Sequence, residues 1–175
     1  MQVFTYGSLM FDPVWRRVVR GRYRAEPASV EGLQRGRLRG ESYPGLWPGE
    51  PGDRVVGVLY RDVGRSDLVA LDRFEGEQYQ RRPWICRVGE ACLSAELYLL
   101  SPAYRRRRSS RPWDPEWFAR QGLAQFLRPY RGFRATPPTL NSGRSAPGPS
   151  PLRSPRTGAG RGRYPGVHRP GHGPS

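Results

Sequence analysis

The sequence predicts an α+β domain in which a mainly antiparallel sheet, open or curled into a small barrel, carries helices at its sides. Three observations support this fold class. Short β-forming segments alternate with turns rich in Gly and Pro, two Asp-Pro pairs stand where helices would begin, and the run "VVGVLYRDV" at 55–63 has the composition of a strand. No segment repeats along the chain, so one domain at 1–134 accounts for these elements.

The first elements are a strand, a short helix and a second strand. A strand from Val3 is expected to end at Gly7. Asp12 and Pro13 then suit the N-cap and the first position of a helix of about two turns. The segment 28–38 follows as a strand with polar interruptions.

The middle of the chain is expected to contain a loop, a strand and a helix. The stretch 40–54 holds too many Gly and Pro residues for regular structure. The strand at 55–63 contains Gly57, which indicates a bulge or the close approach of another backbone. Ser66 is placed to cap a short amphipathic helix, and Gly76 to end it.

The last elements are a hairpin and a helix. Strands at 78–88 and 92–100 are expected to turn at Gly89–Glu90. A basic loop at 101–112 follows, and Asp114 is placed to cap the next helix. The apolar stripe of that helix is Trp117, Phe118, Leu123 and Phe126.

The segment 135–175 differs in composition from the rest of the chain. It holds 9 Pro and 8 Gly, and its only aliphatic anchors are Leu140, Leu152 and Val167. Because so little apolar surface cannot offset the entropy lost on ordering, this tail is expected to be disordered.

The net charge of +15 invites a nucleic-acid interpretation, but its origin argues against one. All 30 basic residues are Arg, a bias typical of GC-rich codons. The tail holds 6 of them and no acid, so 1–134 carries 24 − 15 = +9. No specific nucleic-acid partner is therefore expected, and a salt-sensitive association with polyanions stays an alternative.

The two cysteines and the lack of apolar segments suggest a cytoplasmic protein. Cys86 and Cys92 match no zinc spacing, so buried thiols are expected, with a cross-strand disulfide as the alternative. The N-terminus has no secretory signal, and no apolar run is long enough to span a membrane.

Proton transfer in this domain would fall to carboxylates or tyrosines, because His168 and His172 both lie in the tail. Glu75 stands apart among the acids, since it ends the predicted helix beside Phe74. The negative end of the helix dipole and the apolar neighbour both favour a raised pKa, which suits a general acid and base. Asp72 is the competing candidate, and an exposed, solvated Glu75 is the alternative.

Three ordered motifs carry a family resemblance. "VFTYGSL", "YPGLWPGEPGDRVVGVLY" and "ALDRFEGEQYQRRPW" resemble, in this order and spacing, the γ-glutamylcyclotransferase-like superfamily. Within it, the sequence is most similar to the branch of avirulence-induced plant proteins and γ-glutamylamine cyclotransferase. The similarity spans about residues 2–134.

The resemblance implies a small β-barrel with flanking helices and a reaction without metal or cofactor. The family converts a small-molecule γ-glutamyl amine or peptide to 5-oxoproline and releases the free amine. The glutamyl α-amine attacks its own side-chain carbonyl, so the protein mainly imposes a folded-back conformer and moves protons. The motifs specify neither the leaving amine nor the oligomeric state.

The family's functional positions can be carried over residue by residue. Its "Y-G-[ST]-L" loop falls on Tyr6, Gly7, Ser8 and Leu9. The resemblance implies that backbone N–H groups of this loop bind a carboxylate or a developing oxyanion. It also implies that Glu75 accepts a proton from the α-ammonium and returns one to the departing amine.

Other matched positions are expected to support the pocket rather than to react. They are Tyr79, Arg81 and Tyr98. Arg105–Arg108 is more basic than the family predicts, and it is interpreted as a solvated charge run, with contact to an anionic substrate as the alternative. A non-catalytic protein that binds a small amine or a partner through the same pocket is the second functional interpretation.

Overall fold

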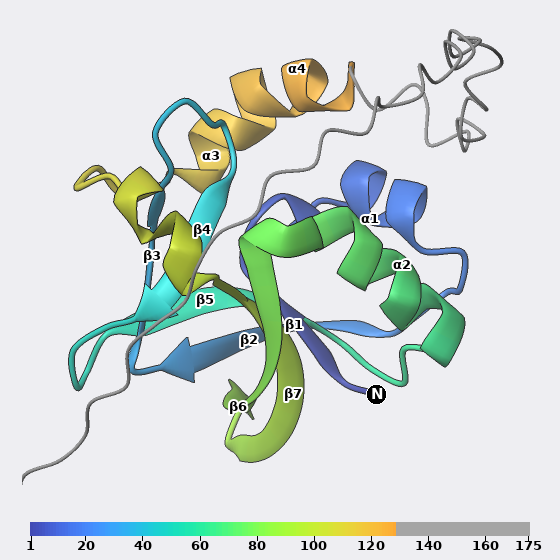
Figure 1. Ribbon diagram of the computed structural model, residues 1–175. Coiled ribbons are helices and arrows are strands. Elements are labelled where there is room, and N and C mark those ends of the chain that lie inside the picture. Colours follow the sequence, from blue (N-terminus) through green and yellow to red (C-terminus); the bar gives the residue numbers. More distant parts are fainter. Residues whose placement is uncertain (129–175) are drawn as a thin grey trace, which may run out of the picture. The chain divides into compact units, whose positions relative to one another are not determined.

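Five strands close into a barrel in the computed structural model, which describes residues 1–128 (Figure 1). The strands, in their order around the barrel, are β1 (Val3–Thr5), β5 (Arg54–Tyr60), β2 (Ala25–Glu31), β6 (Tyr79–Val88) and β7 (Ala91–Leu100). Neighbours are antiparallel except where β7 meets β1, which pair in parallel through Val3 and Glu96. The predicted α+β class and the barrel are confirmed, and the tail expected at 135–175 lies outside the described residues.

The barrel interior is filled by side chains that alternate along the strands. In β5, Val55 and Leu59 are buried, whereas Val56 is exposed. Gly57 lies on the buried side, and a β-carbon there would stand 2.1 Å from the carbonyl oxygen of Thr5. The close approach predicted from the glycine is confirmed, because the backbone of β1, which pairs with β5, leaves no room for a side chain at this position.

A second, two-stranded sheet corrects two predictions. The segment 28–38 is not one strand, because the chain turns at Gly32 with a φ of +73° and continues as β3 (Leu33–Arg37). The stretch 40–54 is not irregular throughout, since it contains β4 (Pro44–Pro48), paired antiparallel with β3. β4 is buried along most of its length, so it shows no alternation of polar and apolar residues that the sequence could reveal.

The first helix forms where expected, but its cap does not. α1 covers Asp12–Val18, and Phe11 occupies the N-cap position. The N–H of Trp15 already bonds to the carbonyl of Phe11 (3.0 Å), so the helix begins one residue earlier than predicted. The Asp12 carboxylate instead pairs with Arg16 on the exposed face (2.8 Å).

The second helix has the same correction at its start. α2 covers Arg65–Glu75 and follows an N-cap at Gly64, so Ser66 lies inside the helix and does not cap it. Its predicted end is confirmed, because Gly76 adopts a φ of +60° that favours glycine. The next turn is the 3-10 helix η2 (Gly76–Gln78), which leads directly into β6.

Both helices pack side by side against the outside of the barrel (Figure 1). The ring of Trp15 stacks on that of Tyr60 with a centroid distance of 3.5 Å and an interplanar angle of 3°. Leu68 and Leu71 of α2 are buried in the same cluster. The end of α2 is thereby fixed against the strands that surround the pocket described below.

The C-terminal elements are short helical turns. They are the 3-10 helix η3 (Pro102–Arg107), α3 (Pro115–Trp117), a π-helical turn (Phe118–Gly122) and α4 (Leu123–Leu127). The segment 101–112 is therefore not wholly a loop. The cap at Asp114 is confirmed, since its carboxylate accepts from the N–H groups of Glu116 and Trp117. The part of the predicted helix beyond 128 lies outside the described residues.

The cysteine prediction is half correct. Both thiols are free, and Cys86 is buried, but Cys92 is exposed near the hairpin turn. Among the helices of residues 1–128, none is both long and apolar enough to cross a membrane.

Candidate active site

A pocket of about 220 Å³ opens between the barrel and the helices. Its lining includes the whole 6–9 loop, Glu75 at the end of α2, Tyr79 of β6 and Tyr98 of β7. The remaining lining residues are Phe4, Thr5, Tyr43, Pro44, Phe74, Gln78 and Phe126. The 6–9 loop and Glu75, which the sequence analysis singled out, thus share one cavity although they lie far apart in the chain.

The 6–9 loop is held at its first residue by contacts from two sides. The Tyr6 hydroxyl donates to the carbonyl of Tyr98 (2.6 Å), which ties the loop to β7. Arg35 of β3 donates from Nη1 to the carbonyl of Tyr6 (2.8 Å). These bonds fix where β1 ends, and therefore where the loop turns into the pocket.

The rest of the loop forms the 3-10 helix η1 (Ser8–Met10). Its first helical bond runs from the N–H of Met10 to the carbonyl of Gly7 (3.0 Å), so the N–H groups of Ser8 and Leu9 precede the first internal donor. A β-carbon on Gly7 would stand 2.9 Å from a ring carbon of Pro44, another lining residue. Glycine therefore keeps the loop close to the opposite wall without filling the space between them.

Glu75 is the last residue of α2 and is partly buried in the pocket wall. Burial raises the pKa of its carboxyl to about 8, in the direction expected from the sequence. At neutral pH this carboxyl is mainly protonated, yet it lies close enough to its pKa to exchange a proton in either direction. Such a group meets the first requirement of a general acid and base.

Asp72, the competing candidate, is committed to structural bonds. Its carboxylate accepts from Arg81 Nε (2.8 Å) and from the Tyr98 hydroxyl (2.8 Å). It does not belong to the pocket lining. Arg81 does not line the pocket either, and it also pairs with Glu96 of β7 (3.3 Å). The Asp72–Arg81 pair therefore braces the end of α2 against β6 and β7.

Four tyrosines line the pocket and remain protonated. They are Tyr6, Tyr43, Tyr79 and Tyr98. Burial is the main cause that raises the pKa of each, and it brings the pKa of Tyr43 to about 12. The Tyr79 hydroxyl donates to the carbonyl of Pro44 (2.7 Å). The pocket wall thus contains neutral phenols. Among its described lining residues, Glu75 is the only one with an acidic carboxyl or a basic side chain.

Sequence reasoning did not assign several lining residues to the site, among them Tyr43 and Gln78. Both stand inside the motifs that carried the resemblance, directly before Pro44 and Tyr79. That adjacency was the available signal, but nothing local distinguishes these side chains from surface residues.

The described residues offer no evident metal site. Within 1–128, no group of three or more His, Cys, Asp or Glu side chains is arranged to hold a metal ion. His168 and His172 lie outside the described part of the chain.

Comparison with known proteins agrees with the motif reading. The family described as γ-glutamyl cyclotransferase, AIG2-like matches residues 3–117. AIG2-like protein D of Arabidopsis thaliana is 33% identical over 79 residues, which are 45% of this chain and 51% of that protein. The chain spans about half the length of the curated relatives it matches.

Solved structures share the fold. A protein of Arabidopsis thaliana known from its solution structure superposes with a TM-score of 0.57 at 22% identity, over 82% of this chain and 94% of that one. A γ-glutamyl cyclotransferase superposes with a TM-score of 0.52 at 18% identity, over 83% of this chain and 93% of that one. At such identities these likenesses show the fold alone.

Proposed function

Because the chain belongs to the γ-glutamyl cyclotransferase, AIG2-like family, we propose that it cyclises a γ-glutamyl amine or peptide to 5-oxoproline and releases the free amine. The observation that carries this proposal is the shared cavity of Glu75 and the 6–9 loop. One side would supply the proton acceptor and the other would supply backbone donors. A reducing, cytoplasmic location without a specific nucleic-acid partner belongs to the same proposal, and the free thiols are compatible with it.

In the first step, the ionised carboxylate of Glu75 accepts a proton from the substrate's α-ammonium group. The neutral amine then attacks the γ-carbonyl carbon of the same glutamyl unit, and a carbon–nitrogen bond closes the five-membered ring. Because nucleophile and carbonyl belong to one molecule, holding the folded-back conformer removes most of the entropic barrier.

In the second step, the tetrahedral intermediate collapses. Its oxyanion is stabilised by N–H groups of the 6–9 loop, of which those of Ser8 and Leu9 precede the first helical donor. The bond to the leaving nitrogen breaks as the Glu75 carboxyl returns its proton to that nitrogen. The second proton of the ring nitrogen then passes through the same carboxylate to the released amine, which departs as an ammonium ion. The products, 5-oxoproline and a free amine, together contain all the atoms of the substrate, so no water is consumed.

The direct test is incubation of the purified full chain with a panel of γ-glutamyl amines and γ-glutamyl peptides. Formation of 5-oxoproline, measured by mass spectrometry together with the released amine in equal amounts, is the expected result. A matched α-glutamyl compound is the control, because its side-chain carbonyl carries no leaving amine. If no member of the panel yields 5-oxoproline, the proposed activity is wrong. Binding without turnover would instead support a non-catalytic protein of this fold.

The rate is expected to rise with pH between about 6 and 8. The first step needs ionised Glu75, and a carboxyl with a pKa of about 8 is only about one-tenth ionised at pH 7. Initial rates of the best substrate at concentrations below KM should therefore rise about ninefold from pH 6 to pH 7 and about fivefold from pH 7 to pH 8, and they should level off above pH 8. A rate that stays constant from pH 6 to pH 8 would contradict the assignment of Glu75 as the base.

A further inference from the structure

Arg107 does not behave as part of a solvated charge run. Its neighbours Arg105 and Arg106 are exposed, but Arg107 is partly buried at the end of η3. Its guanidinium forms an ion pair with Glu41. The interpretation of the whole run as solvated is therefore wrong at this position.

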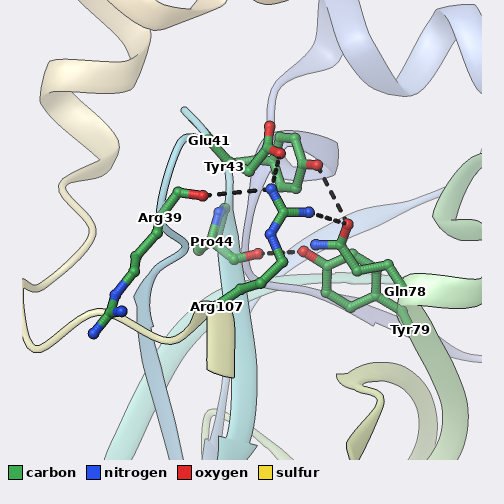
Figure 2. Close-up of polar contacts among 7 residues, drawn as sticks. All are labelled: Arg39, Glu41, Tyr43, Pro44, Gln78, Tyr79 and Arg107. Carbon is green, nitrogen blue, oxygen red and sulfur yellow. Dashed lines mark hydrogen bonds and ion pairs between the residues drawn. The ribbon is translucent and has the colours of Figure 1, made fainter. Parts of the chain in front are cut away.

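The same guanidinium reaches two more acceptors, as Figure 2 shows. It donates from Nη1 to Oε1 of Gln78 (3.4 Å) and from Nη2 to the carbonyl of Arg39 (3.4 Å). Arg39 lies in the segment before β4, and Gln78 lies in η2, three residues after Glu75. One cation thus joins two segments that are far apart in the chain.

Two further hydrogen bonds connect these segments directly (Figure 2). The Tyr43 hydroxyl donates to Oε1 of Gln78 (3.5 Å), and the Tyr79 hydroxyl donates to the carbonyl of Pro44 (2.7 Å). These four residues all line the pocket, whereas Arg107 does not. Arg107 therefore stands behind the wall that they form.

The position of the Gln78 side chain depends on Arg107 more than the length of their hydrogen bond suggests. A guanidinium has no acceptor atom, so the Gln78 atom that faces it must be the amide oxygen. The amide nitrogen of Gln78 is buried without a hydrogen-bond partner, so it does not help to hold the side chain. Without Arg107, the Gln78 oxygen would keep only the long bond from Tyr43.

We propose that Arg107 is a positioning residue: by joining Glu41 and Arg39 to Gln78, it holds Tyr43 and Gln78 in the pocket wall and so raises the affinity for substrate. Direct contact with substrate is not part of its role, because Arg107 does not line the pocket and its guanidinium already serves three acceptors, of which only Gln78 belongs to the lining. The predicted effect of Arg107 on substrate affinity rests on the proposed function. Its effect on the positions of Tyr43 and Gln78 does not.

The test compares Arg107→Met with Arg106→Met in the full chain. Both substitutions remove one positive charge from the same run, but only Arg107 makes the three contacts. Hydrogen–deuterium exchange of backbone amides at 39–43 should become about tenfold faster in Arg107→Met and stay unchanged in Arg106→Met. KM for the best γ-glutamyl substrate should rise about 5- to 20-fold in Arg107→Met, while the pH dependence set by Glu75 is retained.

Two additional variants separate positioning from general destabilisation. Arg107→Lys keeps the charge but cannot reach three acceptors at once, so KM should recover only in part. Glu41→Gln should raise KM as well, and the double variant should be no worse than Arg107→Met, because both substitutions remove the same ion pair. A lower kcat at unchanged KM would indicate partial unfolding and would overturn the proposal.

The outcomes distinguish this inference from the proposed function. Equal exchange at 39–43 in the two Met variants overturns the positioning role, whatever the activity of the wild type. If exchange is faster in Arg107→Met but the wild-type protein cyclises no γ-glutamyl compound, the positioning role of Arg107 in the pocket wall stands. Only the proposed reaction is then overturned.

Discussion

Replacing Glu75 with Gln is expected to abolish turnover of γ-glutamyl substrates and to leave the fold intact. Glutamine has nearly the same shape as protonated glutamate but cannot take up or return a proton. Since proton transfer of this kind contributes about 10²- to 10⁴-fold in rate, kcat should fall by at least about a hundredfold. The measurement is 5-oxoproline formation at saturating substrate. Activity near that of the wild type would remove Glu75 from the reaction.

The stability of the same variant gives an independent check. The pKa of Glu75 is about 8 in the folded protein, against an ordinary value of 4.5 that applies to the unfolded chain. Between these two pH values the folded state therefore binds a proton at Glu75 that the unfolded state does not. The stability associated with protonated Glu75 is present below pH 4.5 and is lost as pH rises through 8. Wild-type stability should therefore fall across this range in urea denaturation, and Glu75→Gln should lack that part of the slope.

The matched control is Asp72→Asn. Asp72 lies on the same helix but outside the pocket lining, and its carboxylate is bonded to Arg81 and to the Tyr98 hydroxyl. Its substitution should cost stability, because it weakens the brace between α2 and the strands, and most of kcat should survive. Loss of turnover in Asp72→Asn at unchanged stability, with activity retained in Glu75→Gln, would exchange the roles of the two carboxylates.

Replacing Gly57 with Ala is expected to cause the largest loss of stability. The new β-carbon would stand 2.1 Å from the Thr5 carbonyl oxygen and 2.7 Å from the ring of Phe4. Because the first of these atoms belongs to the backbone of β1, no side-chain rotation relieves the collision. We expect a cost of about 3 kcal/mol in the free energy of unfolding, the upper end for an overpacked site, measured by chemical denaturation.

The control for Gly57→Ala is Gly89→Ala in the hairpin turn. No atom lies within 4 Å of a β-carbon at Gly89, but its φ of +58° disfavours alanine. This variant should therefore lose only the strain of a left-handed residue, about 1 to 2 kcal/mol. Equal losses in the two variants would show that the contact between β1 and β5 is looser than the structure describes.

Local signals predicted the elements whose ends depend on local chemistry. The Asp114 cap, the stop at Gly76 and the hairpin between β6 and β7 formed as expected, because each follows from the conformational preferences of one or two residues. The strand β4 was missed, since it forms by pairing with β3 and by burial of both its faces. The caps expected at Asp12 and Ser66 failed because these side chains stand one and two positions after the N-cap, where they cannot satisfy the first N–H groups.

The site was predicted by a different route. Tyr6–Leu9 came from ordered motifs, and Glu75 came both from its place at a helix end beside Phe74 and from those motifs. Their convergence on one pocket required the closed barrel. Tyr43 and Gln78 were missed because only tertiary packing turns them toward the cavity. Arg107 was taken as solvated because its partner Glu41 lies far away in the sequence.

The parallel contact between Val3 and Glu96 has a consequence for how the protein is made. A ribosome delivers β1 long before β7, so the ring of strands stays open until the second arm of the last hairpin has emerged. Closure over so long a loop is slow, and barrels dominated by such distant pairings fold in about milliseconds to seconds. The newborn chain therefore cannot close its barrel before β7 has emerged.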